Sequence, residues 1–278
     1  MRSRGVLYMA ASALGFSAMS LLVKLASPRL PTGEIVFARA AMTLVLSYVM
    51  VRRAGLHTWG NQHGKLIVRG FLGFGGLSCY YAALARLSLA DATILQNTIP
   101  LLTAGLAWWV LDEHIGKSTV FALVCGIVGV VIMVEPGGHG IDPVGAVIAI
   151  AGATCSAVAY VTVRQLSRTE HPLVIVMYFP LIATPLALPW AAMDFVVPEP
   201  IDWLLFVAIA AATQVGQVFL TMGLSVERAG RATSVGYLQV LFAMMWQLAV
   251  FGIAPELTTI AGAALIVVGT LAVATRRS

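Results

Sequence analysis

The sequence predicts an all-α integral membrane protein of ten transmembrane helices, arranged as two inverted five-helix repeats with both termini in the cytoplasm. Three observations support this fold: an apolar composition, ten apolar stretches of spanning length, and an internal repeat offset by 140 positions. Of the 278 residues, 59% are hydrophobic and only 10% are charged. A soluble domain carries about 25% charged residues, so the composition excludes an ordinary soluble protein.

Each expected span is an apolar stretch close to the length that a bilayer requires, which is about 20 residues. The expected bounds are 5–26, 33–51, 66–86, 90–111, 117–134, 143–165, 173–193, 202–224, 231–251 and 258–275. These spans use most of the chain. Because irregular backbone cannot face lipid, the connections between them are expected to be short and to lie at the two membrane surfaces.

Two long stretches, 5–134 and 145–274, show the same pattern. Gly5 and Ala92-Thr93 of the first stretch, for example, recur 140 positions later. Each copy holds five apolar spans, and five is odd, so the second copy must enter the membrane from the side opposite to the first. This inverted-topology repeat is an architecture used by many secondary transporters. The two repeats are expected to occupy residues 1–138 and 139–278.

The basic residues predict the orientation of the chain. With the N-terminus in the cytoplasm, most of the 17 lysines and arginines fall on the inner side, and Arg69 is one of them. The four exceptions are Lys24, Arg29, Arg39 and Arg86. Such a bias in short loops is the positive-inside signal. It predicts a multi-pass protein of the inner (cytoplasmic) membrane, surrounded by lipid. It also explains the net charge of +5 without a nucleic-acid partner.

Several kinds of chemistry have no signature in this sequence. It contains no nucleotide-binding P-loop and no clustered metal ligands, so we expect no cofactor and no metal site. Apart from Arg39, no charged residue is expected near the middle of a span, which argues against a strongly charged substrate and a buried proton relay. A membrane enzyme would have only Asp112-Glu113-His114 as a titratable cluster, and this is more simply a polar helix end at the inner surface.

Polar and aromatic side chains at membrane depth mark six of the spans at helical spacing. Phe74 corresponds to Gln214 across the repeat and Tyr81 to Thr221, so the stripes of the third and eighth spans occupy equivalent faces. The candidate substrate-binding residues are Ser20, Phe74, Ser78, Tyr81, Gln96, Asn97, Tyr160, Gln214, Gln217 and Tyr237. We expect them to surround a central cavity for a small polar solute. The alternative is that they hydrogen-bond neighbouring helices.

Proline and glycine predict local features of four spans. Pro100 lies inside the fourth span and should kink it, as a structural bend or as a gating hinge. Three prolines predict an irregular, peripheral seventh helix: Pro180, Pro185 and Pro189. Small residues of the fifth and tenth spans, such as Gly129 and Gly269, allow close helix packing, either within the chain or in a dimer. Monomer and homodimer both remain open.

Several motifs resemble the drug/metabolite transporter superfamily of the EamA type. The residues that carry the resemblance are Leu14-Gly15-Phe16 with Lys24, Glu34 with Phe37 and Arg39, Ala90-Asp91-Ala92 leading to Pro100, and Leu111-Asp112-Glu113. The second copy departs from the pattern at three positions: Pro180, Val240 and Ile253. The resemblance covers nearly the whole chain and implies export of small metabolites by alternating access, with the aromatic and neutral amino-acid exporter branch most similar.

An amino acid is a plausible substrate for the residues of the expected cavity. Gln and Asn offer both donors and acceptors for a zwitterion. Three tyrosines could flank an aromatic side chain or an ammonium group: Tyr81, Tyr160 and Tyr237. One alternative is a multidrug or other-metabolite exporter of the same fold. An alternative of another class is a membrane-embedded enzyme, but we expect a transporter and no enzyme.

Overall fold

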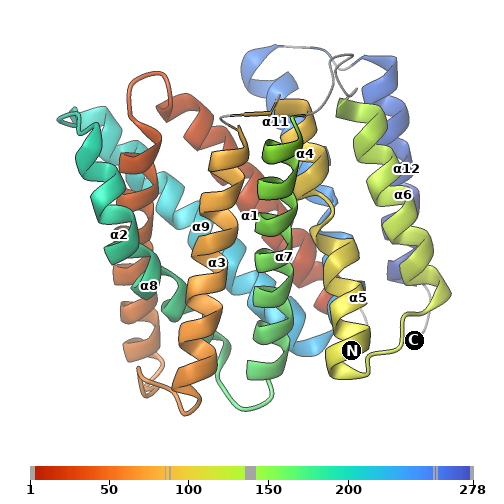
Figure 1. Cartoon of the computed structure of the whole chain (residues 1–278), viewed down its shortest axis with the longest axis horizontal. Coiled ribbons are helices and arrows are strands. Elements are labelled where there is room, and N and C mark those ends of the chain that lie inside the picture. The colour runs from red at the N-terminus through yellow and green to blue at the C-terminus, as the bar shows by residue number, and fades with distance from the viewer. Residues whose placement is uncertain are drawn as a thin grey trace.

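The computed structural model describes residues 4–84, 86–87, 89–134, 142–252, 254 and 256–275, and all regular structure in these residues is helical (Figure 1). The helices of the first half are α1 (Arg4–Ala26), α2 (Thr32–Arg53), α3 (His63–Leu84), α4 (Leu89–Gln96), α5 (Ile99–Leu111) and α6 (Lys117–Val134). Those of the second half are α7 (Pro143–Leu166), α8 (Pro172–Met193), α9 (Pro200–Val226), α10 (Ala229–Val235), α11 (Leu238–Phe251) and α12 (Leu257–Thr275).

These helices supply the ten apolar spans that the sequence predicts. Eight helical stretches in the described residues are long and apolar enough to cross a membrane, and α6 and α12 are two shorter apolar helices. Many large apolar side chains on the outside of the bundle are exposed, for example Val207 and Leu204. Such a surface suits a lipid environment, where no hydrophobic force drives these side chains inward.

The fourth and ninth spans are each broken into two helices. α4 ends at Gln96 and α5 begins at Ile99. Pro100 lies buried in the first turn of α5. The bend expected at Pro100 is therefore seen as a two-residue turn, since proline lacks the N–H that a continuous helix needs. The ninth span breaks between α10 and α11 at Gly236 and Tyr237, without a proline.

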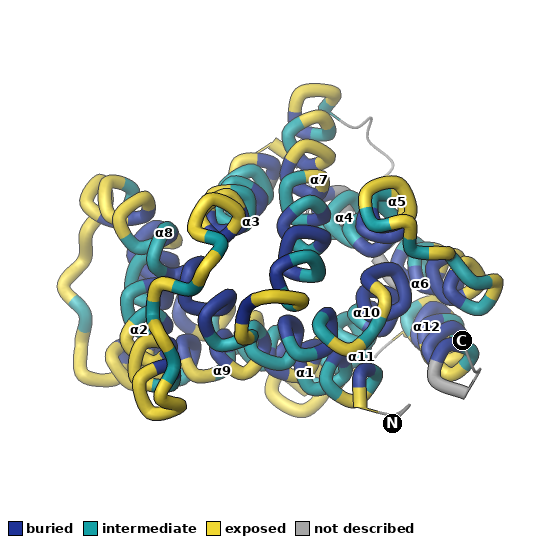
Figure 2. Tube along the Cα trace, turned by 90° about the horizontal axis from the view of Figure 1, so that it is seen from below, coloured by how far each residue is buried: buried dark blue, intermediate teal, exposed yellow. Residues whose placement is uncertain are grey.

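The expectation of an irregular seventh span is wrong. α8 is one continuous helix with Pro180, Pro185 and Pro189 inside it. Its buried face includes Tyr178 and Phe179, and packing of this face against α2 keeps the helix together. α8 and α2 do lie at the edge of the bundle (Figure 2).

The most extensive helix contacts join one half of the chain to the other: α1 packs on α9, α3 on α7, α2 on α8 and α6 on α12. Glycines allow the backbones to approach. A Cβ on Gly15 of α1 would lie 2.7 Å from the backbone nitrogen of Gly216 in α9, and a Cβ on Gly129 of α6 would lie 2.7 Å from the carbonyl oxygen of Gly262 in α12. Of the two roles expected for the glycines of the fifth and tenth spans, Gly129 and its partner therefore serve packing within the chain.

Candidate substrate pathway

A buried arginine lies at the centre of one polar group in the bundle. Arg69 of α3 is 3% exposed, and its Nη2 donates a hydrogen bond of 3.0 Å to Oε1 of Gln217 in α9. Its guanidinium carbon lies 5.1 Å from the ring centroid of Phe179 in α8. The phenol of Tyr160 in α7 is close enough to interact with it electrostatically. Four helices thus converge on one cation.

The position of Arg69 corrects the expectation drawn from the charge pattern. The sequence places this residue with the inner-surface charges, but the structure buries it about 9 Å along α3, six residues from the start of the helix. Arg39 of α2 is also buried, at 7% exposure, and its Nη1 lies 3.4 Å from Sδ of Met19. Two guanidinium groups therefore lie inside membrane-spanning helices, and the argument against a charged substrate fails.

Gln214 and Tyr81 contact other partners. Oε1 of Gln214 accepts a hydrogen bond of 3.1 Å from Oγ of Ser47, which joins α9 to α2. The ring of Tyr81 makes an edge contact with Trp190 of α8, with centroids 5.6 Å apart, and its phenol interacts electrostatically with Arg39. For Gln214 the interhelical hydrogen bond, which the sequence left as the alternative, is present.

The two helix breaks meet in a second polar group. The phenol of Tyr237, between α10 and α11, donates a hydrogen bond of 3.0 Å to the backbone carbonyl of Asn97, between α4 and α5. Tyr237 is 1% exposed, and its ring packs so closely on Gly126 of α6 that a Cβ there would lie 2.2 Å from the ring. Beside the break, the buried Oε1 of Gln96 has no hydrogen-bond partner among the described residues.

The remaining predicted residues lie apart from these groups. Ser20 of α1 lines a pocket of about 140 Å³ between α1 and α11, together with Lys24 and Trp246. Phe74 packs against the buried cluster of Ala40, Phe179 and Ala183. Ser78 is partly buried in α3.

The predicted residues are thus only partly brought together. The structure joins Gln217 and Tyr160 through Arg69, places Phe74 against the cluster that contains Phe179, and joins Asn97 to Tyr237 directly. It leaves Ser20 in a separate pocket and turns Gln214 toward α2. These residues form neighbouring polar groups at membrane depth and do not all face one cavity.

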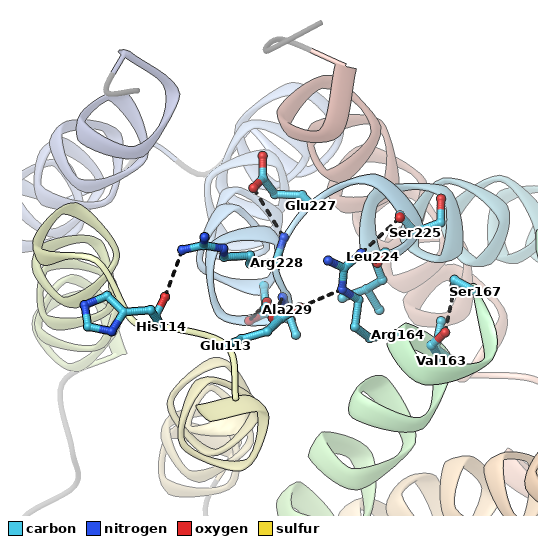
Figure 3. Close-up of polar contacts among 11 residues, drawn as sticks. Glu113, His114, Val163, Arg164, Ser167, Leu224, Ser225, Glu227, Arg228 and Ala229 are labelled. Carbon is cyan, nitrogen blue, oxygen red and sulfur yellow. Dashed lines mark hydrogen bonds and ion pairs between the residues drawn. The ribbon is translucent and has the colours of Figure 1, made fainter. Parts of the chain in front are cut away.

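An ion-pair network joins the two halves at the face that carries the N-terminus of α1, here called the N-terminal face. Arg164, at the end of α7, donates through Nε to Oε1 of Glu113 over 2.8 Å and through Nη1 to the carbonyls of Leu224 and Ser225 at the end of α9 (Figure 3). Oε2 of Glu113 accepts a hydrogen bond of 2.7 Å from the backbone N–H of Ala229, at the start of α10.

Both carboxylate oxygens of Glu113 are therefore occupied in holding two second-half helices, α7 and α10, to the α5–α6 connection. A pocket of about 310 Å³ opens beside this network and is lined in part by His114, Lys117 and Arg228. The Asp112-Glu113-His114 cluster, which the sequence offered as the one candidate for enzyme chemistry, supplies a structural carboxylate here.

The opposite face has different contacts between the halves. Lys24 of α1 lies 140 positions before Arg164, and its Nζ lies 4.7 Å from the ring centroid of Phe251 in α11. Ion pairs also join the halves at this face: Arg29 lies 3.4 Å from Asp202 at the start of α9, and Arg86 lies 3.7 Å from Asp142 at the start of α7. Both faces therefore carry charged contacts between the halves.

Sequence reasoning missed three of these residues for identifiable reasons. Arg69 stands only three residues inside the expected span 66–86, which was a signal that it lies at membrane depth. Glu113 and Arg164 are 51 residues apart and carry no local pattern that would pair them. Only the packing of α5 beside α7 brings them together.

Comparison with known proteins decides the class of protein. The model of the EamA-like transporter family matches residues 3–135 and, a second time, residues 143–275. The chain belongs to the EamA-like transporter family. It is thus a multi-pass membrane protein of the drug/metabolite transporter superfamily, as the motifs of the sequence indicated.

Relatives of this EamA-family chain include transporters from distant organisms. It is 37% identical to the pseudopaline exporter of Pseudomonas aeruginosa, over 96% of this chain and 95% of that protein. It is 27% identical to solute carrier family 35 member G1 of Mus musculus, over 98% of this chain and 78% of that one. A solved crystal structure matches with a TM-score of 0.86 at 21% identity, over 99% of this chain and 97% of that chain, which supports the fold.

Proposed function

We propose that this protein exports small polar metabolites across the cytoplasmic membrane by alternating access, with neutral and aromatic amino acids as the first substrates to test. The observation that carries this proposal is membership of the EamA-like transporter family over nearly the whole chain. The polar groups around Arg69 and Tyr237 support it, since polar side chains at membrane depth are costly and mark substrate paths.

In this proposal the halves 1–138 and 139–278 are inverted repeats that rock against each other, and the N-terminal face is cytoplasmic. The Glu113–Arg164 network joins the halves at that face, and the pairs Arg29–Asp202 and Arg86–Asp142 join them at the other face. The breaks at Asn97 and Tyr237 are the points where the fourth and ninth spans bend, with Pro100 setting the first of them.

Export of pseudopaline or a similar compound is the second candidate. The observation that favours it is the 37% identity to a pseudopaline exporter over 95% of that protein. Among the relatives described above, this is the one whose name states a substrate, and that substrate differs from the free amino acids that the sequence suggested.

Purified protein in liposomes tests both candidates. Liposomes loaded with radiolabelled amino acids, or with pseudopaline, should release their contents faster than empty-membrane controls at zero membrane potential and equal pH. A Gln217→Ala variant of equal folded amount should release them more slowly. If no candidate leaves wild-type liposomes faster than the controls, with or without a proton gradient, export of these compounds is wrong.

A further inference from the structure

We propose that Arg69 binds a carboxylate of the transported molecule, so that the substrate class of this exporter is small organic acids and zwitterions that present a free carboxylate. This inference rests on the proposed export function and specifies it further. It starts from the observation that Arg69 is buried while two of its donor nitrogens lack a hydrogen-bond partner among the described residues.

Arg69 has five N–H donors and a permanent positive charge. Gln217 accepts a hydrogen bond from Nη2, but Nε and Nη1 are both buried and have no hydrogen-bond partner among the described residues. None of the ion pairs found in the described part of the chain includes Arg69. Two donor nitrogens of a buried guanidinium are therefore left for a group outside the chain.

Burying an unpaired charge is expensive, because the protein interior does not replace the water that the charge loses. The ring of Phe179 lies 5.1 Å from the guanidinium carbon and the neutral phenol of Tyr160 lies nearby, but neither supplies a negative charge. A helix bundle that only required packing would lose little with a leucine at this position. Retaining the cation makes sense when an anion completes the site during each cycle.

The surroundings of Arg69 suit a carboxylate that is attached to an apolar group. Gln217 offers a side-chain N–H₂ as a further donor beside the guanidinium, and the ring of Phe179, which the guanidinium faces, provides an aromatic floor. Charge-assisted hydrogen bonds between a guanidinium and a carboxylate are short and directional. The aromatic floor would contact the apolar part of the same molecule, so an amino acid with a large side chain satisfies both features.

The test compares an acid with its own amide. L-phenylalanine and L-phenylalaninamide share a side chain and differ at the carboxylate. Binding is measured as the shift in thermal unfolding of the purified detergent-solubilised protein, and transport is measured separately as efflux from liposomes. The variants are Arg69→Gln, Arg69→Lys and, as a matched loss of one positive charge from an exposed position at the end of α2, Arg53→Gln.

We expect the acid, and not the amide, to stabilise the wild type and Arg53→Gln. Arg69→Gln should lose about 10- to 100-fold in affinity for the acid, the value of one hydrogen bond to a charged group. Arg69→Lys should recover part of this loss, because the charge is kept while the planar donor set is not. If Arg69→Gln does not fold, Arg69→Lys alone should still weaken binding of the acid at least several-fold.

The role of Arg69 would be overturned by any of three results. The acid and the amide could stabilise the wild type equally, the acid could stabilise wild type and Arg69→Lys equally, or the acid could fail to stabilise the wild type. The efflux measurement keeps the two proposals apart. Efflux that does not depend on Arg69 would leave export intact and remove the carboxylate anchor. Acid binding that depends on Arg69, without efflux, would support the anchor and count against export.

Discussion

Neutralising Glu113 should open the N-terminal face. The side chains of Glu113 and Arg164 are only 10% and 18% exposed, so solvent screens their attraction weakly. Removing one partner of a buried ion pair costs about 3–5 kcal/mol. A Glu113→Gln side chain can still accept one hydrogen bond, worth about 1 kcal/mol, so we expect a net loss of about 2–4 kcal/mol. That corresponds to about a 30- to 700-fold shift toward the open form, at 1.4 kcal/mol for each factor of ten.

A reporter cysteine can measure this shift. Ala107 lines the pocket beside Glu113 and is 1% exposed, so Ala107→Cys should react with a membrane-impermeant maleimide only when the N-terminal face opens. The three native cysteines, which are Cys79, Cys125 and Cys155, are first replaced by alanine. We expect Glu113→Gln to raise the labelling rate in inside-out vesicles by at least tenfold.

Glu227→Gln is the matched control for this experiment. Glu227 pairs with Arg231 over 3.6 Å at the same face, but both residues belong to the second half, so their pair does not tie the halves together. The labelling rate of the Glu227→Gln variant should stay within about twofold of the parent rate, because the Glu227–Arg231 pair does not join the two halves. Equal labelling of the parent and Glu113→Gln would refute the role of Glu113 as a closure of this face.

Three further predictions follow from the packing and the polar groups. Gly126→Ala should lower the free energy of unfolding by about 1–3 kcal/mol, since its Cβ would meet the ring of Tyr237, whereas Gly105→Ala, which has open space around it, should leave thermal unfolding in detergent unchanged. Tyr237→Phe should cost about 1 kcal/mol through the lost hydrogen bond between the helix breaks, as measured by the same unfolding assay. Gln214→Ala or Tyr81→Ala should slow efflux without reducing the amount of folded protein; unchanged efflux in both would exclude them from the substrate path.

Much of the fold could be predicted from composition, but the breaks and buried charges depend on tertiary contacts. Apolar length is a local property, so the ten spans were recognisable one by one. Pro100 indicated the first break for the same reason, because a missing N–H acts within one turn. The break at Tyr237 has no such residue and depends on packing against α6 and on Asn97.

The candidate site was predicted less completely than the fold. Helical spacing could select the polar faces of α3 and α9, but it could not show which side chains satisfy each other, such as Gln214 with Ser47. The charge count also placed Arg69 on the inner side although it lies inside the expected span 66–86, and the structure buries it. Pairing and depth are set by neighbours that lie far away in the chain.

The contact between Asn97 and Tyr237 has a consequence for the symmetry of the two repeats. Position 237 lies 140 residues after position 97, so in the proposed duplication each residue is the counterpart of the other. A residue that touches its own counterpart lies on a two-fold axis, and in a dimer of identical single repeats the two side chains would have to be the same. Fusion of the repeats into one chain allows an asparagine and a tyrosine to share this position. The difference between them breaks the equivalence of the two repeats at the axis itself.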